Sequence, residues 1–152
     1  MACLALTLII CWPGVSHFTS RLWGDQGDTL QTLWNGWWMG EALSRGMSPM
    51  FTPMLWHPDG ISMWLHTFGP LNALLTAAGL AVLPGFAGFN LVVLLHVWLA
   101  ALGGFLVCRA VLRRAREDER LPGALGERLS WLCALAGGAA FAYTPYLWAH
   151  IQ

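Results

Sequence analysis

The sequence predicts an all-α integral membrane protein with about three transmembrane helices, plus interfacial or re-entrant helices in a first external loop. Composition is the first observation behind this class. Hydrophobic residues make up 57% of the 152 residues and charged residues only 11%, whereas about a quarter of the residues in soluble domains are charged. The second observation is that positive charge is clustered beside apolar segments. The chain has no lysine, and six of its eight arginines fall between positions 109 and 128. They are Arg109, Arg113, Arg114, Arg116, Arg120 and Arg128.

Two segments are long and apolar enough to span a bilayer. They are residues 90–108 and residues 129–147, which are almost free of charge. A transmembrane helix needs about 20 such residues to cross about 30 Å of hydrocarbon. Each segment carries a glycine pair, Gly103-Gly104 or Gly137-Gly138, and adjacent small residues let helices approach closely in lipid.

Two further apolar stretches are weaker candidates. Residues 2–12 are too short to span alone, and they lack the basic start and cleavage site of a signal peptide, so they are interpreted as a clipped first transmembrane helix. Residues 68–83 contain Pro70 and Asn72 and are followed by Pro84-Gly85. This second stretch could span, re-enter, or lie in the interface, and we predict that it does not cross the membrane.

Charge sets the predicted orientation. Arginine-rich short loops stay in the cytoplasm, which places the arginine cluster inside and the first loop outside. We therefore expect one membrane domain over residues 1–152, organised as a first span (1–15), an external loop with interfacial helices (16–85), a span (86–112), a cytoplasmic loop (113–128) and a last span (129–148).

A tryptophan-rich helix is predicted from Asp28 to Gly46. Its apolar residues recur at three- and four-residue spacings, and they are Leu30, Leu33, Trp34, Trp37, Trp38 and Leu43. Asp28 stands where an N-cap would accept hydrogen bonds from free backbone N–H groups, and Gly46 and Pro49 end the pattern. Indole rings gather at membrane interfaces, so this helix is expected to hold the external loop against the bilayer surface.

The two acids at the start of this helix have a structural and a functional interpretation. In the structural one, Asp28 caps the helix and Asp25 is a solvated loop acid. In the functional one, a carboxylate held at the boundary of water and lipid accepts a proton from a hydroxyl or helps to bind a divalent cation. The metal, if any, is unknown.

Histidines form the other polar candidates. The stretch "WHPDG" is a turn in which Gly60 can take a positive φ, and His57 and Asp59 project from it. His66 and His17 fall in the same loop region and could help to bind phosphate, although no HxxxH spacing joins them to a metal.

Several other functions are disfavoured. The four cysteines lie in apolar runs without a CxxC pair and are interpreted as small hydrophobic residues. Nucleic-acid binding is not expected, because acids neutralise much of the arginine cluster.

The order of short motifs resembles a known family. "GDTLQTLW" follows the first apolar segment, the tryptophan-rich helix ends in "RGMSP", and a "PDG" turn comes next; "FGPLNALL", a span ending in arginine, and "GGAAFAYTPYLWAH" complete the series. This order is similar to the N-terminal part of bacterial polytopic glycosyltransferases of the GT-C superfamily, including YfhO-like membrane proteins. His57 departs from the pattern, since tyrosine is commoner there.

The resemblance implies a fold, a reaction and a place. The chain would be the N-terminal part of a multi-pass enzyme in the bacterial cytoplasmic (inner) membrane, with a polyprenyl-phosphate sugar donor and a cell-envelope glycan, lipid or protein as acceptor. Asp28 matches the motif acid and would deprotonate the acceptor hydroxyl, and Asp25 is a weaker match that would help to bind substrate. Arg21, His57 and His150 would stabilise the leaving lipid phosphate. No cofactor is certain beyond a possible divalent cation.

Two alternatives remain open. The chain could be a non-enzymatic small membrane scaffold or assembly subunit, with its glycines packed against a partner. It could also belong to a transporter, although neither strong span contains an intramembrane carboxylate.

Overall fold

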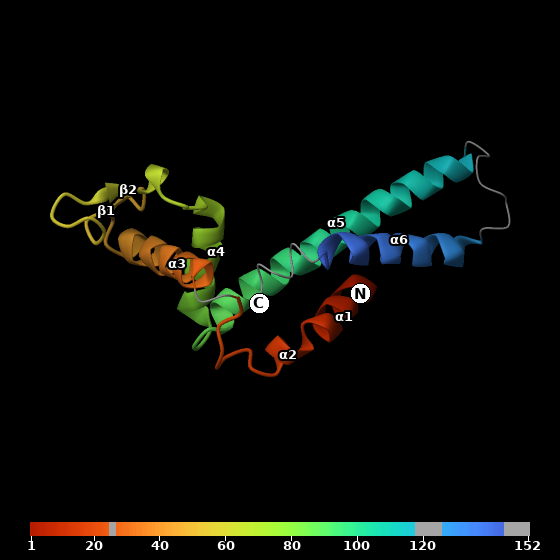
Figure 1. The fold of residues 1–152 in the computed structure, drawn as a ribbon, viewed down its shortest axis with the longest axis horizontal. Helices are drawn as coiled ribbons and strands as arrows, with labels where there is room; N and C mark the ends of the chain where they lie inside the picture. Colours follow the sequence, from red (N-terminus) through yellow and green to blue (C-terminus); the bar gives the residue numbers. More distant parts are fainter. Residues whose placement is uncertain (25–26, 118–125, 145–152) are drawn as a thin grey trace. The chain divides into compact units, whose positions relative to one another are not determined.

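A computed structural model describes residues 1–24, 27–117 and 126–144, and most of their regular structure is helical (Figure 1). Two compact units are formed, one by Met1–Ser16 with Val93–Gln152 and the other by His17–Val92. The elements in chain order are α1 (Ala2–Ile10), α2 (Trp12–Val15), α3 (Asp28–Ser44), β1 (Phe51–Thr52), β2 (Ile61–Ser62), the 3₁₀ helix η1 (Met63–Leu65), α4 (Pro70–Val82), α5 (Ala87–Glu117) and α6 (Glu127–Ala142).

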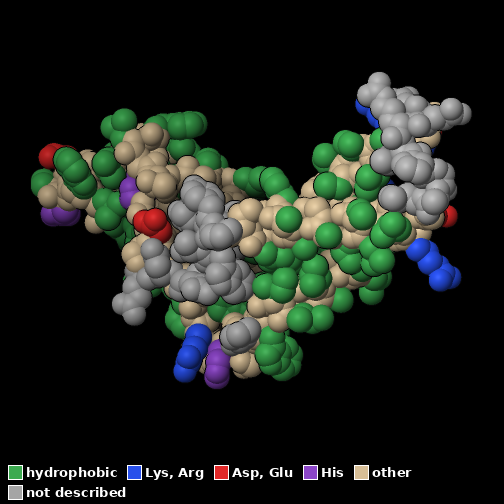
Figure 2. Space-filling view, turned by 45° about the vertical axis from the view of Figure 1, so that its right-hand side comes forward, with side chains coloured by type: hydrophobic (Ala, Val, Ile, Leu, Met, Phe, Trp, Pro, Cys, Tyr) green, Lys and Arg blue, Asp and Glu red, His purple; other side chains and the backbone are tan. Residues whose placement is uncertain are grey.

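Helix α5 is long and apolar enough to cross a membrane. It has 31 residues, and only 17% of its most apolar stretch is buried, whereas the core helix of a soluble protein would be mostly buried. Side chains such as Leu99, Leu106 and Val107 are about half exposed or more. Figure 2 shows many hydrophobic side chains on the surface of the viewed face, with few charged ones among them.

In the part of the chain that it describes, the structure does not show three helices that are each long enough to span a membrane. Among the described residues, α5 is the one helix that meets the length and composition needed to cross a bilayer. Helix α6 has 16 residues and α1 has nine, which correspond to about 24 Å and about 14 Å at 1.5 Å per residue. Helix α4 has 13 residues, about 20 Å, so its length agrees with the expectation that 68–83 does not cross alone.

In the first unit, glycines allow α5 and α6 to pack closely (Figure 1). A Cβ added at Gly104 would lie 3.1 Å from the Cα of Gly138, and one added at Gly138 would lie 2.5 Å from the carbonyl oxygen of Ala101. The predicted close approach is therefore confirmed at Gly104 and Gly138. Gly103 has nothing within 4 Å of such a Cβ, so it takes no part.

Helix α1 also packs on α6, and a partly buried polar pair joins α1 to the end of α6. The Thr7 hydroxyl donates to the carbonyl oxygen of Cys3 at 2.8 Å, and its oxygen lies 2.8 Å from the Tyr143 hydroxyl. Because the single proton of Thr7 is used on Cys3, Tyr143 is the donor to Thr7. Tyr143 is the C-cap of α6, which therefore ends before Pro145, as expected for a helix approaching proline.

In the second unit, α3 packs against α4 through two glycines one helical turn apart. A Cβ at Gly36 would meet the side chain of Thr76, and one at Gly40 would lie 3.5 Å from the Cβ of Ala77. Small residues at this spacing remove the side chains that would otherwise hold the two backbones apart. The "GWWMG" stretch thus sets the distance between these helices.

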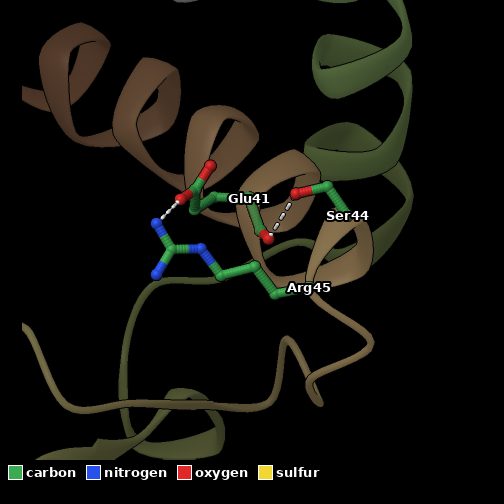
Figure 3. Close-up of polar contacts among 3 residues, drawn as sticks. All are labelled: Glu41, Ser44 and Arg45. Atoms are coloured by element: carbon green, nitrogen blue, oxygen red, sulfur yellow. Dashed lines mark hydrogen bonds and ion pairs between the residues drawn. The ribbon is translucent and has the colours of Figure 1, made fainter.

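Helix α3 ends at Ser44, two residues before the end that the sequence predicted. Gly46 has φ +66°, its N–H donates to Leu43, and the N–H of Met47 donates to Ala42. These two bonds form a Schellman motif, in which glycine occupies the left-handed position after the C-cap. In the last turn, Glu41 pairs with Arg45 and its carbonyl accepts from Ser44 Oγ at 2.9 Å (Figure 3).

The "WHPDG" turn closes a short antiparallel hairpin. Phe51 pairs with Ser62 and Thr52 with Ile61, and Gly60 has the expected positive φ of +73°. A side chain at Gly60 would also collide with the ring of Phe51. Two separate constraints therefore favour glycine at this position.

Trp38 corrects the expectation that the tryptophans of α3 face the membrane surface. It is 1% exposed and forms a core with Ala42 and Met63, and its Nε1–H donates to the Pro49 carbonyl at 3.1 Å rather than to water. The segment after α3 folds back and covers this side of the helix. Trp37, with 43% of its surface exposed, remains available at the surface.

Candidate functional site

Asp28 is the first helical residue of α3 and not its N-cap. Gly27 is the N-cap, and no side-chain hydrogen bond caps the helix, so the structural interpretation of Asp28 as a cap is wrong. The physical reason is position: the N-cap is the non-helical residue that precedes the first helical one, and here Gly27 occupies it. The Asp28 carboxylate is exposed, and no hydrogen bond or ion pair joins it to another described residue.

One turn further along α3, Gln31 forms a polar pair with His66. The amide nitrogen Nε2 of Gln31 lies 3.2 Å from Nε2 of His66. An amide nitrogen only donates, so His66 accepts at Nε2 and carries its proton on Nδ1. Residues three apart on a helix share a face, so Asp28 lies on the same side of α3 as this pair.

Trp34 forms the apolar wall beside the pair. The imidazole of His66 meets its ring edge-on, with centroids 6.3 Å apart and planes at 88°. On its other side Trp34 stacks on the buried Trp38, with centroids 6.3 Å apart and planes at 9°. The ring of Trp34 is thus held in place by packing, while it remains partly accessible.

Asn35 fixes the backbone that carries His66. It is 4% exposed, and its Nδ2 donates to the Thr67 carbonyl at 2.8 Å. Its Oδ1 is buried without a hydrogen-bond partner among the described residues. Asp28, Gln31 and Asn35 follow one another at three- and four-residue steps, so one face of α3 holds the carboxylate and both amides of this site.

An apolar groove of about 360 Å³ adjoins the same part of α3. Trp34 belongs both to this groove and to the surroundings of His66. The apolar groove and the polar pair are therefore neighbours. The groove walls are formed by the leucines and aromatic residues Leu30, Leu33, Trp34, Trp37, Leu80 and Phe86.

Arg21 lies in a loop that Asn90 anchors to the start of α5. Asn90 is fully buried, and its Nδ2 donates to the carbonyl oxygens of Phe18 and Arg21, both at 2.7 Å. Its Oδ1 accepts from the N–H of Trp23 at 3.0 Å. The backbone of Arg21 is thus fixed while its side chain is exposed.

His57 lies in the hairpin, and Met63 of η1, directly after the hairpin, packs on the C-terminal half of α3. Its side chain is exposed, and no contact joins it to Asp28 within the described part of the chain. A role for His57 in substrate binding stays a prediction. Asp25 and His150 lie outside the described residues.

No group of three or more His, Cys, Asp or Glu side chains that could hold a metal ion occurs among the described residues. The site at the start of α3 therefore contributes one carboxylate, one imidazole and two amides. A carboxylate can accept a proton from a hydroxyl, and Gln31 and His66 can hydrogen-bond a polar ligand that rests against the Trp34 ring.

Sequence reasoning did not select Gln31, Asn35 or Asn90, and it gave His66 only a general role in phosphate binding. The helical spacing of Gln31 and Asn35 from Asp28 was a usable signal, because it places the three side chains on one face of α3. The partners of these residues are 32 to 72 positions away along the chain, and no local pattern identifies them.

Comparison of the chain with protein-family models, with curated proteins and with solved structures found no match. The function is therefore inferred from the residues of the chain itself.

Proposed function

We propose that residues 1–152 form the N-terminal part of a multi-pass membrane glycosyltransferase of GT-C type. In this proposal the enzyme transfers a sugar from a polyprenyl-phosphate donor to an acceptor in the cell envelope. The observation that carries the proposal is the exposed carboxylate of Asp28 at the first turn of α3, one helical turn from the Gln31–His66 pair. The order of sequence motifs around Asp28 is the second support.

In the proposed reaction Asp28 accepts the proton of the acceptor hydroxyl. The acceptor oxygen attacks the anomeric carbon as the bond to the donor phosphate breaks, and the polyprenyl phosphate leaves with the electron pair. Gln31 and His66 are placed to hydrogen-bond sugar or acceptor hydroxyls, with the ring of Trp34 beside them. Arg21, with its fixed backbone and exposed side chain, would attract the leaving phosphate.

The apolar groove beside Trp34 supports a lipid-linked donor over a soluble one. A polyprenyl chain needs an apolar surface close to the reacting phosphate, and this groove has leucine and aromatic walls. The start of α5, the helix that is long enough to cross a membrane, follows Phe86 of the groove directly. These features agree with a site at the membrane surface.

We also propose a topology for the chain. Helices α5 and α6 would cross the inner membrane, with the loop 113–128 in the cytoplasm and the loop 16–85 on the other side. Single cysteines introduced at positions 27 and 114 of an otherwise cysteine-free protein test this with an impermeant reagent. Labelling of both positions from the same side of the membrane would contradict the topology.

The catalytic proposal is tested by Asp28→Asn in the full-length protein, in membranes supplied with radiolabelled polyprenyl-phosphate hexoses. Asparagine retains the shape of the side chain but cannot accept the proton, so transfer should fall by about 10²-fold or more. The loss of an acid from the first turn of a helix costs only about 0.3–1 kcal/mol, which leaves the protein folded and inserted.

Glu41→Gln is the matched control, because it makes the same acid-to-amide change on the same helix. Glu41 lies near the C-terminal end of α3 in a partly exposed ion pair with Arg45 (Figure 3), and it takes no part in the site. Its variant should keep wild-type transfer. Unchanged transfer by Asp28→Asn in a protein that is active with one of these donors would refute the role of Asp28.

A further inference from the structure

A second cavity, lined by charged side chains, lies between the C-terminal end of α5 and the first turns of α6, in the unit formed by Met1–Ser16 and Val93–Gln152. It has a volume of about 110 Å³ and opens beside a wider, polar hollow. Its walls are formed by Arg109, Leu112, Arg113, Arg116, Glu127, Ser130 and Trp131. This cavity has no role in the proposed sugar transfer.

The three arginines are brought to one face by helical geometry. Arg109, Arg113 and Arg116 follow one another at four- and three-residue steps, so their side chains lie on the same side of α5. Arginine remains charged at every physiological pH and carries a planar set of donors that suits phosphate oxygens. The same face is the one turned toward α6, because residues of α6 complete the cavity.

Among the described residues, three arginines face two acids at the cavity, so these side chains leave it positively charged. Arg113 donates to Glu117 at 2.9 Å, in a pair whose two side chains are mostly exposed. Glu127 is the other acid at the cavity. Arg109 and Arg116 have no ion-pair partner among the described residues, so two guanidinium groups remain available to an anion.

Ser130 supplies a second, independent observation. Its hydroxyl oxygen is buried and has no hydrogen-bond partner among the described residues, although the residue lines the cavity. Buried polar groups in proteins are nearly always paired with protein or solvent. This hydroxyl, at the wall of a cationic cavity, is therefore available to donate to a ligand oxygen.

The position of the cavity identifies the kind of ligand. Leu112 and Trp131 add apolar surface to its lining, and α5 runs from this end into its long apolar stretch. Cationic cavities between helices at the end of an apolar segment suit anionic lipid headgroups. We infer that this cavity binds the phosphate of an anionic membrane lipid, with Arg109 and Arg116 holding the phosphate and Ser130 donating to it.

The test uses the full-length protein in a neutral detergent, titrated with phosphatidylglycerol, with diacylglycerol or with inorganic phosphate, and reads bound lipid by native mass spectrometry. One molecule of phosphatidylglycerol should bind to each wild-type protein. Diacylglycerol has the same chains without the phosphate and should not bind there. Inorganic phosphate at millimolar concentration should not displace the lipid, because it lacks the chains that contact Leu112 and Trp131.

The variant pair Arg109→Gln with Arg116→Gln should weaken phosphatidylglycerol binding by about tenfold or more. The pair Arg114→Gln with Arg128→Gln makes the same change in charge at exposed arginines outside the cavity lining, and its effect should stay within about threefold. Ser130→Ala should weaken binding by about threefold to tenfold without loss of thermal stability, because its hydroxyl has no described partner to lose.

Equal weakening by the two arginine pairs would overturn the inference, because it would reduce the effect to general surface charge. Binding of diacylglycerol as tight as that of phosphatidylglycerol would overturn it as well. Displacement of the lipid by inorganic phosphate would assign the cavity to a free anion instead of a lipid. Binding that Ser130→Ala leaves unchanged would remove the hydroxyl from the site.

Discussion

Asn90→Ala should release the loop that carries Arg21 from the start of α5. The wild-type side chain makes three hydrogen bonds to this loop, to the carbonyl oxygens of Phe18 and Arg21 and from the N–H of Trp23. Alanine makes none of them. The substitution therefore perturbs residues 17–24. The packing of α5 against α6, in the unit formed by Met1–Ser16 and Val93–Gln152, should not change.

The expected magnitude follows from which groups water can reach. Arg21 is exposed and Phe18 is partly exposed, so water can replace Asn90 at their carbonyls, at a cost of about 0.5–1.5 kcal/mol each. Trp23 is only 8% exposed, so its N–H loses its bond to Asn90 at a place that water reaches poorly, at a cost of about 1–3 kcal/mol. A total near 3 kcal/mol raises the open population of the loop by about 100-fold.

Amide hydrogen exchange of residues 17–24 measures this opening directly, and trypsin cleavage after Arg21 provides an independent reading. Both rates should rise by at least about tenfold in Asn90→Ala, while exchange in α6 stays at the wild-type rate. Asn72→Ala is the control, because Asn72 is exposed on α4. Rates in Asn90→Ala within twofold of those in Asn72→Ala would refute the anchoring role of Asn90.

Three further predictions concern the packing of the helices. Gly138→Ala should lower the free energy of unfolding by about 1–3 kcal/mol, because its Cβ would lie 2.5 Å from a carbonyl oxygen, whereas Gly103→Ala, in open space, should not lower the melting temperature measured by circular dichroism. Gly46→Ala should cost about 1–2 kcal/mol in the same thermal assay, since φ there is +66°; an unchanged melting temperature would contradict the left-handed position. Thr7→Val and Tyr143→Phe each remove the same 2.8 Å hydrogen bond, so a double-mutant cycle should give a coupling energy of about 0.5–1.5 kcal/mol, and additive effects would count against the bond.

The elements that the sequence predicted well are those governed by neighbouring residues. Helix α3 begins at Asp28 as expected and ends two residues before Gly46. Gly46 and Gly60 adopt the positive φ values that their turns require. The apolar stretch after Asn90 forms α5, and the glycines at 104 and 138 allow the close approach that their small size suggested.

The candidate site was predicted only in part, because some of its contacts join residues that are far apart along the chain. Asp28 could be selected because it stands at the junction of an acidic stretch and a helical pattern. Its N1 position, one residue past the cap, depends on a backbone angle at Gly27 that the pattern leaves open. The Gln31–His66 bond joins residues 35 positions apart, so spacing along the chain could not show it.

The sequence by itself determined that this chain is apolar, mostly helical and able to form a helix that crosses a membrane, because helix periodicity, turn sterics and hydrophobicity act over a few residues. Only the tertiary structure decided that Trp38 is buried against Met63 and that Asn90 holds the backbone of Arg21. A tryptophan can satisfy its ring and its N–H at a membrane surface or inside a protein core. An asparagine can bond to water or to three backbone groups. The choice between such states depends on which distant segment folds back to cover the residue. The residues on either side of it in the sequence do not identify that segment.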